Sequence, residues 1–516
     1  MVSKIINGVI KIELEQFLKK YNTEDILNAV IVMFYDECLS KDVLIPSIEM
    51  ITSNALSYYH LDSDNYFDKK AYQEMQEIAA NIFAPKTQEL FMSVMLHVSD
   101  SNDDKMELLK SIQMQLKNMA YRGDAYMFQL FGLAEKFYQP FDKDMKDSYG
   151  FSFSTFEKLI VVAYNKYITI ISFINNEELR LEAINKHMFC INKFELYEMF
   201  DRNEVDSLVE YLSVKIGIDN MKPVSIDDFK TLYSKPIIDF GEYIYFPMMN
   251  ITMLNIPKMF HYTFIAEKKF PKETVSRYTH NRGDVIEQLT KEYLLRLFDN
   301  VYLSLKYPPH DRTFESDITT QCDNATIFAE AKGKILTLQS LQGETKKIKD
   351  DVYNAIGKAY EQAVRSIKYL ESGGKFAGNN DNEVELINTV WKFPVCIMAD
   401  NFVSIPSEIY NYVEVKKAFL LPYAVNIYDL DIVTRECVSK EEFINYMLFR
   451  QMNLKNLSAM DELDIFGYYK KYGMKQLKCD ENEEIWATDF TQEFDAKYNE
   501  ISKKWFTEFT VNNLLR

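Results

Sequence analysis

The sequence predicts a mixed α and β fold, α+β or α/β in class, with a core between two large, predominantly α-helical flanks. Three observations predict it. Apolar residues recur every three or four positions before residue 235 and after residue 400, which is the spacing of one helix face. Runs rich in β-branched and aromatic residues lie between residues 301 and 332, separated by turn residues. Amphipathic helical patterns precede and follow these runs.

The chain divides into four segments by this pattern. They are a helical N-terminal region over 1–235, a hairpin and connecting segment over 236–280, a core over 281–400 and a mainly helical C-terminal region over 401–516. In the second segment, β-prone runs on either side of Gly241 predict a hairpin or a bulged strand. In the first, the apolar stretch 159–174 is shorter than the roughly 20 residues that span a bilayer, so we expect a core helix.

Composition indicates a soluble protein of a reducing compartment. The six cysteines are scattered singly with no CxxC pair, which predicts neither a zinc site nor a disulfide framework. The N-terminus lacks the basic, apolar and small-residue order of a signal peptide. We therefore expect a cytoplasmic protein that has no association with a membrane.

The core segment is predicted to contain six elements in the order helix, three strands, helix, strand. Its first helix is amphipathic, and its second helix is ended by Gly373-Gly374. The first of its strands ends before Pro308-Pro309. The predicted elements are a helix over 284–300, strands over 301–307, 314–321 and 325–332, a helix over 348–370 and a buried strand over 395–399.

The second and third of these strands are predicted to form a tight hairpin. Between them, Asp323-Asn324 is the polar pair that a two-residue hairpin turn prefers. Counting back along both strands from this turn places Asp317 directly opposite Glu330. The same count places Glu315 opposite Lys332.

The four charged side chains of this hairpin are expected to share one face of the sheet. Side chains alternate faces with a period of two, and Glu315, Asp317, Glu330 and Lys332 occupy matching positions. Two carboxylates directly opposed across a ladder repel one another. A divalent cation between Asp317 and Glu330 would relieve that repulsion.

With these residues in place, segment 281–400 resembles the core of the PD-(D/E)xK nuclease superfamily, the restriction-endonuclease-like fold. The resemblance covers roughly a quarter of the chain and includes the αβββαβ order of elements. The matching positions are Glu287 on the first helix, Asp317, and the E-x-K formed by Glu330, Ala331 and Lys332. The chain departs from the family name in having Ser316 where proline precedes the aspartate.

The resemblance implies a role for each matching residue. Asp317 and Glu330 would bind Mg²⁺, for which Mn²⁺ would substitute, with the Ala331 carbonyl as a further ligand. Glu287 would bind a second ion or a metal-bound water, and Lys332 would orient the attacking water or stabilise the developing charge. Gln362 lies where a glutamine or lysine of the second helix approaches the site in several branches of the family.

The chemistry of phosphodiester hydrolysis accounts for these residue types independently. The scissile phosphate must be neutralised, and a water must become nucleophilic near neutral pH. A carboxylate-bound Mg²⁺ does both. The tripeptide E-x-K also begins at Glu267, Glu344 and Glu414, but at none of them does it follow an aspartate-bearing strand across a tight turn.

The charge of the chain bears on the substrate. The net charge of −18 opposes binding to nucleic acid, yet residues 281–375 contain 14 Lys and Arg against 14 Asp and Glu and are locally neutral. We therefore expect weak unaided binding to DNA, or delivery by a protein partner or a homo-oligomer.

The leading hypothesis is a Mg²⁺-dependent nuclease that acts on DNA. By analogy with nucleases of similarly large architecture, it would serve bacterial restriction or anti-phage defence. One alternative keeps the fold and changes the substrate or setting, to an RNase or a recombination or transposition nuclease. The other is a catalytically silent nuclease-like scaffold that binds a protein partner.

Overall fold

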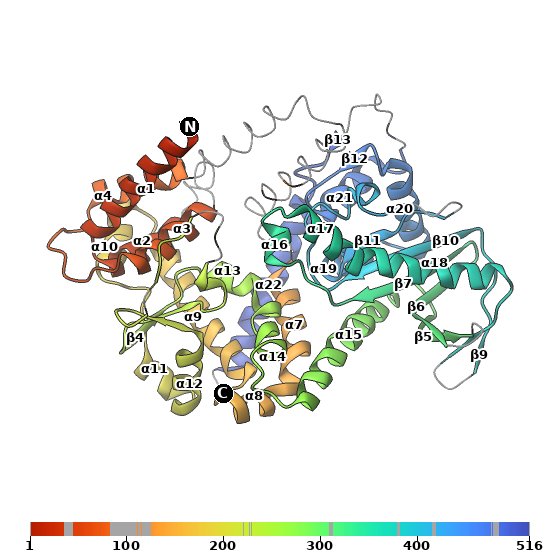
Figure 1. The fold of residues 1–516 in the computed structure, drawn as a ribbon, viewed down its shortest axis with the longest axis horizontal. Coiled ribbons are helices and arrows are strands. Elements are labelled where there is room, and N and C mark those ends of the chain that lie inside the picture. Colours follow the sequence, from red (N-terminus) through yellow and green to blue (C-terminus); the bar gives the residue numbers. More distant parts are fainter. Residues whose placement is uncertain are drawn as a thin grey trace. The chain divides into compact units, whose positions relative to one another are not determined.

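The chain has a mixed α+β fold that separates into two compact units (Figure 1). The computed structural model describes residues 2–35, 45–82, 111, 115, 125–219, 221–225, 228, 230–308, 313–378, 382–414, 419–475, 477 and 485–514. Unit 1 comprises Met1–Ile112, Leu130–Val275 and Ser502–Arg516, and unit 2 comprises Gln113–Gln129 and Ser276–Ile501. No helix of the described residues is long and apolar enough to cross a membrane.

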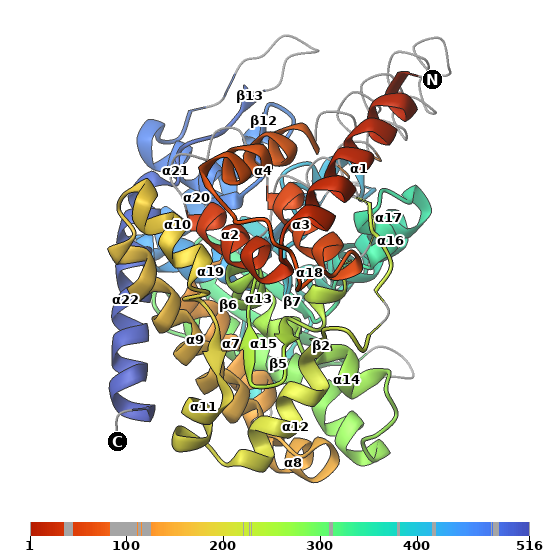
Figure 2. The ribbon, with the colours of Figure 1, turned by 90° about the vertical axis from the view of Figure 1, so that its left-hand side faces the viewer.

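Unit 1 is mainly helical, as predicted for the N-terminal region. Helices α2, α3 and α4 pack side by side in the red and orange part of Figures 1 and 2. The helices of this unit are α1 (Val2–Lys20), α2 (Thr23–Tyr35), α3 (Ile45–Ser57), α4 (Lys69–Ile82), α7 (Met127–Tyr138), α8 (Asp142–Tyr149), α9 (Phe153–Phe173), α10 (Glu177–Asn185), α11 (Lys193–Met199), α12 (Arg202–Leu212), α13 (Met249–Leu254) and α14 (His261–Ile265).

Local sequence explains where these helices begin and what they bury. The hydroxyl of Ser152 accepts a hydrogen bond from the backbone N–H of Thr155 and caps α9. In the same way the Asp201 carboxylate accepts from Glu204 N–H at the start of α12. The core helix predicted over 159–174 forms most of α9, and most of its apolar side chains are buried or half-buried, although Ile168 and Phe173 are exposed.

A four-stranded sheet completes unit 1, with strands in the order β1-β4-β3-β2. The predicted hairpin around Gly241 is confirmed as the antiparallel pair β3 and β4. Gly241 itself has φ +93°, which a residue with a Cβ rarely adopts. The strands are β1 (Ile191–Asn192), β2 (Ser213–Lys215), β3 (Ile237–Asp239) and β4 (Tyr243–Tyr245).

Unit 2 is built on a seven-stranded mixed sheet in the order β11-β10-β7-β6-β5-β8-β9. Strands β5, β6 and β7 form an antiparallel meander, and β10 and β11 continue the sheet in parallel with β7. The strands are β5 (Val301–Tyr307), β6 (Phe314–Cys322), β7 (Ala325–Lys332), β8 (Phe376–Ala377), β9 (Glu383–Val384), β10 (Trp391–Met398) and β11 (Tyr423–Asn426). A separate parallel pair joins β12 (Leu457–Ser458) to β13 (Ile485–Trp486).

The helices of unit 2 confirm the predicted order of helix, three strands, helix, strand. The first helix begins earlier than predicted, and the second is interrupted by a π-helical turn, Tyr353–Gly357. Strand β11 and the small hairpin of β8 and β9 were not predicted. The helices are α15 (Lys272–Leu294), α16 (Leu338–Leu341), α17 (Thr345–Val352), α18 (Lys358–Glu371), α19 (Ile427–Glu436), α20 (Lys440–Asn453), α21 (Glu462–Tyr472) and the part of α22 (Gln492–Asn513) that precedes Ser502.

The apolar face of α18 covers one face of the sheet across β7 and β10, as Figure 1 shows. Ala363 and Ile367 pack with Phe328 of β7 and with Leu305 and Tyr307 of β5. A second cluster continues toward the other edge of the sheet through Ala359 and Ile356, which pack with Cys396, Met398 and Ala424. This packing shows which residues of each strand face α18.

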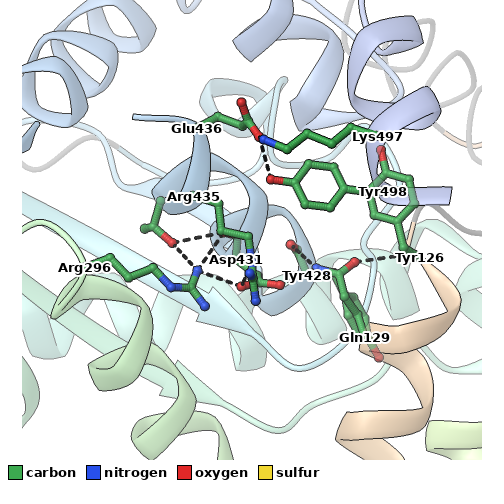
Figure 3. A network of polar contacts seen from close by, with 10 residues as sticks. Tyr126, Gln129, Arg296, Tyr428, Asp431, Arg435, Glu436, Lys497 and Tyr498 are labelled. Atoms are coloured by element: carbon green, nitrogen blue, oxygen red, sulfur yellow. Dashed lines mark hydrogen bonds and ion pairs between the residues drawn. The ribbon is translucent and has the colours of Figure 1, made fainter. Parts of the chain in front are cut away.

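A buried acid on α19 connects distant parts of unit 2 (Figure 3). The Asp431 carboxylate, 1% exposed, forms an ion pair with Arg296 at 2.7 Å and accepts hydrogen bonds from Arg435 at 2.8 Å and Gln129 at 2.9 Å. One turn further along α19, Glu436 pairs with Lys497 and Tyr498 of α22. Helix α19 therefore joins segments that are far apart in the sequence.

Candidate functional site

The hairpin of β6 and β7 has the predicted register over most of its length. Cys322 faces Ala325 across the turn, and pairing continues in step as far as Ile318 and Ala329. Beyond that point the ladder stops, so Asp317 and Glu330 are not a regular cross-strand pair. Instead, the backbone N–H of Ala331 donates to Oδ2 of Asp317 at 3.0 Å. A carboxylate thus takes a position that a backbone carbonyl would occupy in a continued ladder.

The other neighbour of Asp317 is also irregular. Strand β5 pairs with β6 on either side of this point, but Ser304, which lies opposite Asp317, is unpaired there and has φ +53°. The hydroxyls of Ser316 and Thr319 lie 3.0 Å apart, so these residues share a face although three positions separate them. The two-residue alternation of β6 is therefore broken at Asp317.

This break corrects the prediction that all four charged residues share a face. Phe314 packs under α18 with Tyr307, so the adjacent and exposed Glu315 points to the opposite face. Glu330 lies on the α18 face, because it is two positions from Phe328 and pairs in register with Cys396. The predicted opposition of Glu315 to Lys332 is wrong. The ion pair that forms joins Lys332 to Asp317, with Nζ 3.4 Å from Oδ2.

Glu330 is the most unusual residue of the site. Its side chain is 0% exposed, and neither carboxylate oxygen has a hydrogen-bond partner among the described residues. Burial, and then the negative charge of Asp317, raise the pKa of Glu330 well above its ordinary value, while Lys332 opposes this rise. The charged form of an acid that is buried beside a second acid is unfavourable unless a positive group is bound there, and without such a group the raised pKa keeps the acid protonated.

Glu287 approaches the same acids from α15. It is half-buried, and its pKa is raised to about 7 by burial first, and then by the charges of Asp317, Asp284 and Glu315. Lys332 lowers it. The helix glutamate predicted from the sequence is therefore within electrostatic reach of Asp317 and Lys332, and its protonation changes near neutral pH.

Gln362 lies on α18 with a half-buried side chain, and its backbone carbonyl accepts a hydrogen bond from Ser366. In the described part of the chain its amide has no hydrogen bond to Asp317, Glu330 or Lys332. The structure thus brings together Asp317, Glu330 and Lys332, with Glu287 near them, and does not link Gln362 to this group.

The oxygen atoms of this site suit a small cation that prefers oxygen ligands and takes only a few of them from the protein. Among the described residues no group of three or more His, Cys, Asp and Glu side chains is arranged to hold a metal. Mg²⁺, however, is commonly bound by one or two carboxylates, with water and substrate oxygens completing its shell. Asp317 and Glu330 supply two carboxylates of this kind. The N–H and C=O of one strand residue point to the same side, so the Ala331 carbonyl is directed toward β6 and Asp317.

Sequence reasoning missed the backbone features that shape this site. Nothing in the sequence around Ser304 distinguishes it from an ordinary strand residue. The polar run Ser316, Thr319 and Thr320 is completely buried within a central strand. Several polar residues within a predicted central strand are a sequence signal that could have drawn attention to this break.

The site geometry stands alone as a basis for function. Comparisons of the chain with models of protein families, with curated proteins and with solved structures find no match.

Proposed function

We propose that this protein is a metal-dependent nuclease that hydrolyses phosphodiester bonds of DNA. The observation that carries the proposal is Glu330, a fully buried acid beside Asp317 whose oxygens have no positively charged or hydroxyl partner among the described residues. A cation bound by both acids would satisfy the oxygens that the described residues leave without partners. The lysine two residues from Glu330 then lies where it can act on a phosphate held by the same cation.

The proposed roles follow from chemistry and position. Asp317 and Glu330 would hold Mg²⁺, with the Ala331 carbonyl as a third protein ligand and Glu287 near a second ion or a water. When bound, Mg²⁺ neutralises phosphate charge and lowers the pKa of a bound water. The Lys332 ammonium group, which pairs with Asp317 at 3.4 Å, would donate to the attacking water or to the phosphate oxygen. The order of elements and these residues agree with the PD-(D/E)xK arrangement.

The biological setting is the part of the proposal that rests on analogy. A cytoplasmic role in bacterial restriction or anti-phage defence suits a nuclease core joined to large helical regions. The net charge of −18 favours delivery to DNA by a protein partner, since the acidic surface repels a polyanion over about a Debye length. The proposal is tested against three alternative functions: an RNase, a recombination or transposition nuclease, and a silent scaffold.

Purified full-length protein is expected to cleave plasmid DNA in the presence of Mg²⁺ or Mn²⁺ and to stop when EDTA removes the metal. Agarose gels of supercoiled plasmid, linear duplex and RNA of the same sequence measure the result. Cleavage of RNA alone would show that the substrate is RNA and not DNA. Absence of cleavage of any nucleic acid, with binding of a protein partner that survives mutation of Asp317, would favour the scaffold.

Glu330→Gln is expected to stabilise the metal-free protein at pH 8 by about 1–3 kcal/mol, because the new amide donates to Asp317 and no longer has to take up a proton when the protein folds. The raised pKa of Glu330 sets the direction in which the free energy of unfolding of the wild type changes with pH. Wild-type stability is fully present below pH about 4.5 and is lost as the pH rises toward the pKa of the folded protein. Denaturant unfolding at pH 4.5 and 8 measures the difference, which should be largest at pH 8.

Metal binding should reverse the order of stability of the wild type and the Glu330→Gln variant. Mg²⁺ at 100 times its Kd would stabilise the wild type by about 2.7 kcal/mol and the Glu330→Gln variant far less. Glu292→Gln, at an exposed position of α15, is the matched control and should behave as the wild type in both conditions. Equal stabilisation of all three proteins by Mg²⁺ would show that the cation binds elsewhere.

A further inference from the structure

Arg365 of α18 is held over the start of strand β6. Its guanidinium carbon lies 3.9 Å from the centroid of the Phe314 ring, which is the distance of a stacked cation–π contact. Its Nε is buried and has no hydrogen-bond partner among the described residues. Stacking fixes the plane of the guanidinium, and a contact with the Tyr307 hydroxyl uses only part of its five N–H donors, so others remain available to another group.

Arg365 differs from three other arginines of unit 2. Arg296 and Arg435 both pair with Asp431, and Arg450 pairs with Glu462. No carboxylate of the described residues forms an ion pair with Arg365. A positive group that is oriented by an aromatic ring and has no acidic partner is suited to bind an external anion.

The position of Arg365 relates it to the acids of the candidate site. Tyr307 of β5 interacts with both: burial raises the pKa of Tyr307, hydrogen bonds to Ser366 and Arg365 lower it, and the charge of Glu330 raises it. Arg365 and Glu330 are therefore neighbours of one tyrosine on the α18 face of the sheet. Phe314, under the guanidinium, precedes Asp317 by three residues of one strand, which corresponds to about 10 Å.

We propose that Arg365 binds a backbone phosphate of the nucleic acid within about three nucleotides of the cleaved bond, because each strand of a duplex carries one phosphate per 3.4 Å or so of helix axis. This inference rests on the proposed nuclease function and adds a contact that sets the position of the substrate. The guanidinium can donate two parallel N–H bonds to one phosphate, which lysine cannot do. In an acidic protein, such a contact supplies local attraction that the whole surface lacks.

The test measures binding of a fluorescent DNA duplex to the full-length protein by anisotropy. Ca²⁺ replaces Mg²⁺ so that binding is observed without cleavage, and salt is varied between 50 and 200 mM. Arg365→Ala should weaken binding and reduce the slope of log Kd against log salt by about 0.9, the loss of one phosphate contact. Arg365→Lys should restore the slope and only part of the affinity. The single-turnover cleavage rate at saturating DNA should change little in either variant.

Lys368→Ala is the matched control. Lys368 is exposed on the same helix, and its ammonium lies 5.4 Å from the Phe419 ring centroid, so the variant removes an equal charge from a similar contact. Equal slopes for Arg365→Ala and Lys368→Ala would overturn the phosphate contact. If the wild type cleaves DNA and Arg365→Ala binds as the wild type does, the inference fails and the nuclease proposal stands. If the wild type neither binds nor cleaves nucleic acid, both fail.

Discussion

Asp317→Asn is expected to reduce DNA cleavage by at least about a thousandfold, which corresponds to a loss of roughly 4 kcal/mol of transition-state stabilisation. The substitution removes one of two carboxylates proposed to hold the cation and leaves Glu330 to bind it alone. The fold should persist, because the amide oxygen of asparagine can still accept the hydrogen bond that Ala331 N–H donates to Asp317. The loss should therefore lie in catalysis and in metal affinity.

The measurement is the single-turnover rate on plasmid DNA at saturating Mg²⁺, with circular dichroism to confirm folding. Asp323→Asn provides the control, since Asp323 is an exposed aspartate in the turn of the same hairpin and receives the same substitution. Its rate should remain within a factor of two or so of the wild type. A rate for Asp317→Asn within tenfold of the wild type would remove Asp317 from the proposed site.

Asp431→Ala is expected to destabilise unit 2 by about 3 kcal/mol. Removing one partner of a buried ion pair usually costs about 3–5 kcal/mol, because the remaining charges lose their compensation. The lower end applies because Arg296 and Arg435 are 28% and 40% exposed and can be partly hydrated. Gln129 would also lose an acceptor on Asp431, although it keeps its bond to the Tyr428 carbonyl at 3.0 Å.

A shift of this size should lower the melting temperature of unit 2 by roughly 6–12 °C, at 2–4 °C per kcal/mol for a domain of 150–250 residues. Differential scanning calorimetry measures it. Asp299→Ala is the control: Asp299 is 88% exposed, and its pair with Lys440 at 3.7 Å is a surface contact worth less than about 1 kcal/mol. Similar melting temperatures for the two variants would show that the Asp431 network contributes little to stability.

The features of the fold that could be predicted from sequence are those that depend on neighbouring residues. The polar pair Asp323-Asn324 specifies a short turn, and the turn sets the register of β6 and β7 as far as Ile318 and Ala329. The apolar stripe of α18, with Ala359 and Ala363, identifies its buried face. Local pattern was therefore enough to place Asp317 and Glu330 close together.

The remaining features depend on residues that are distant in the sequence. The break in the ladder involves Ser304, whose positive φ is imposed by its setting in the sheet and not by its residue type. Strand β11 is four residues long within a region whose pattern is helical. The bond from Gln129 to Asp431 spans about 300 positions of the chain, so no local pattern indicates it.

The parallel pairing of β10 with β11 has a consequence for how this protein can be divided. Without β11, residues Val395–Met398 would present unsatisfied backbone groups along an open border of the sheet, a template for aggregation. The fragment that carries the acids is thus shorter than the fragment that can fold. Any exchange of this core between proteins, by evolution or by engineering, must carry the strand and the helix that follow it.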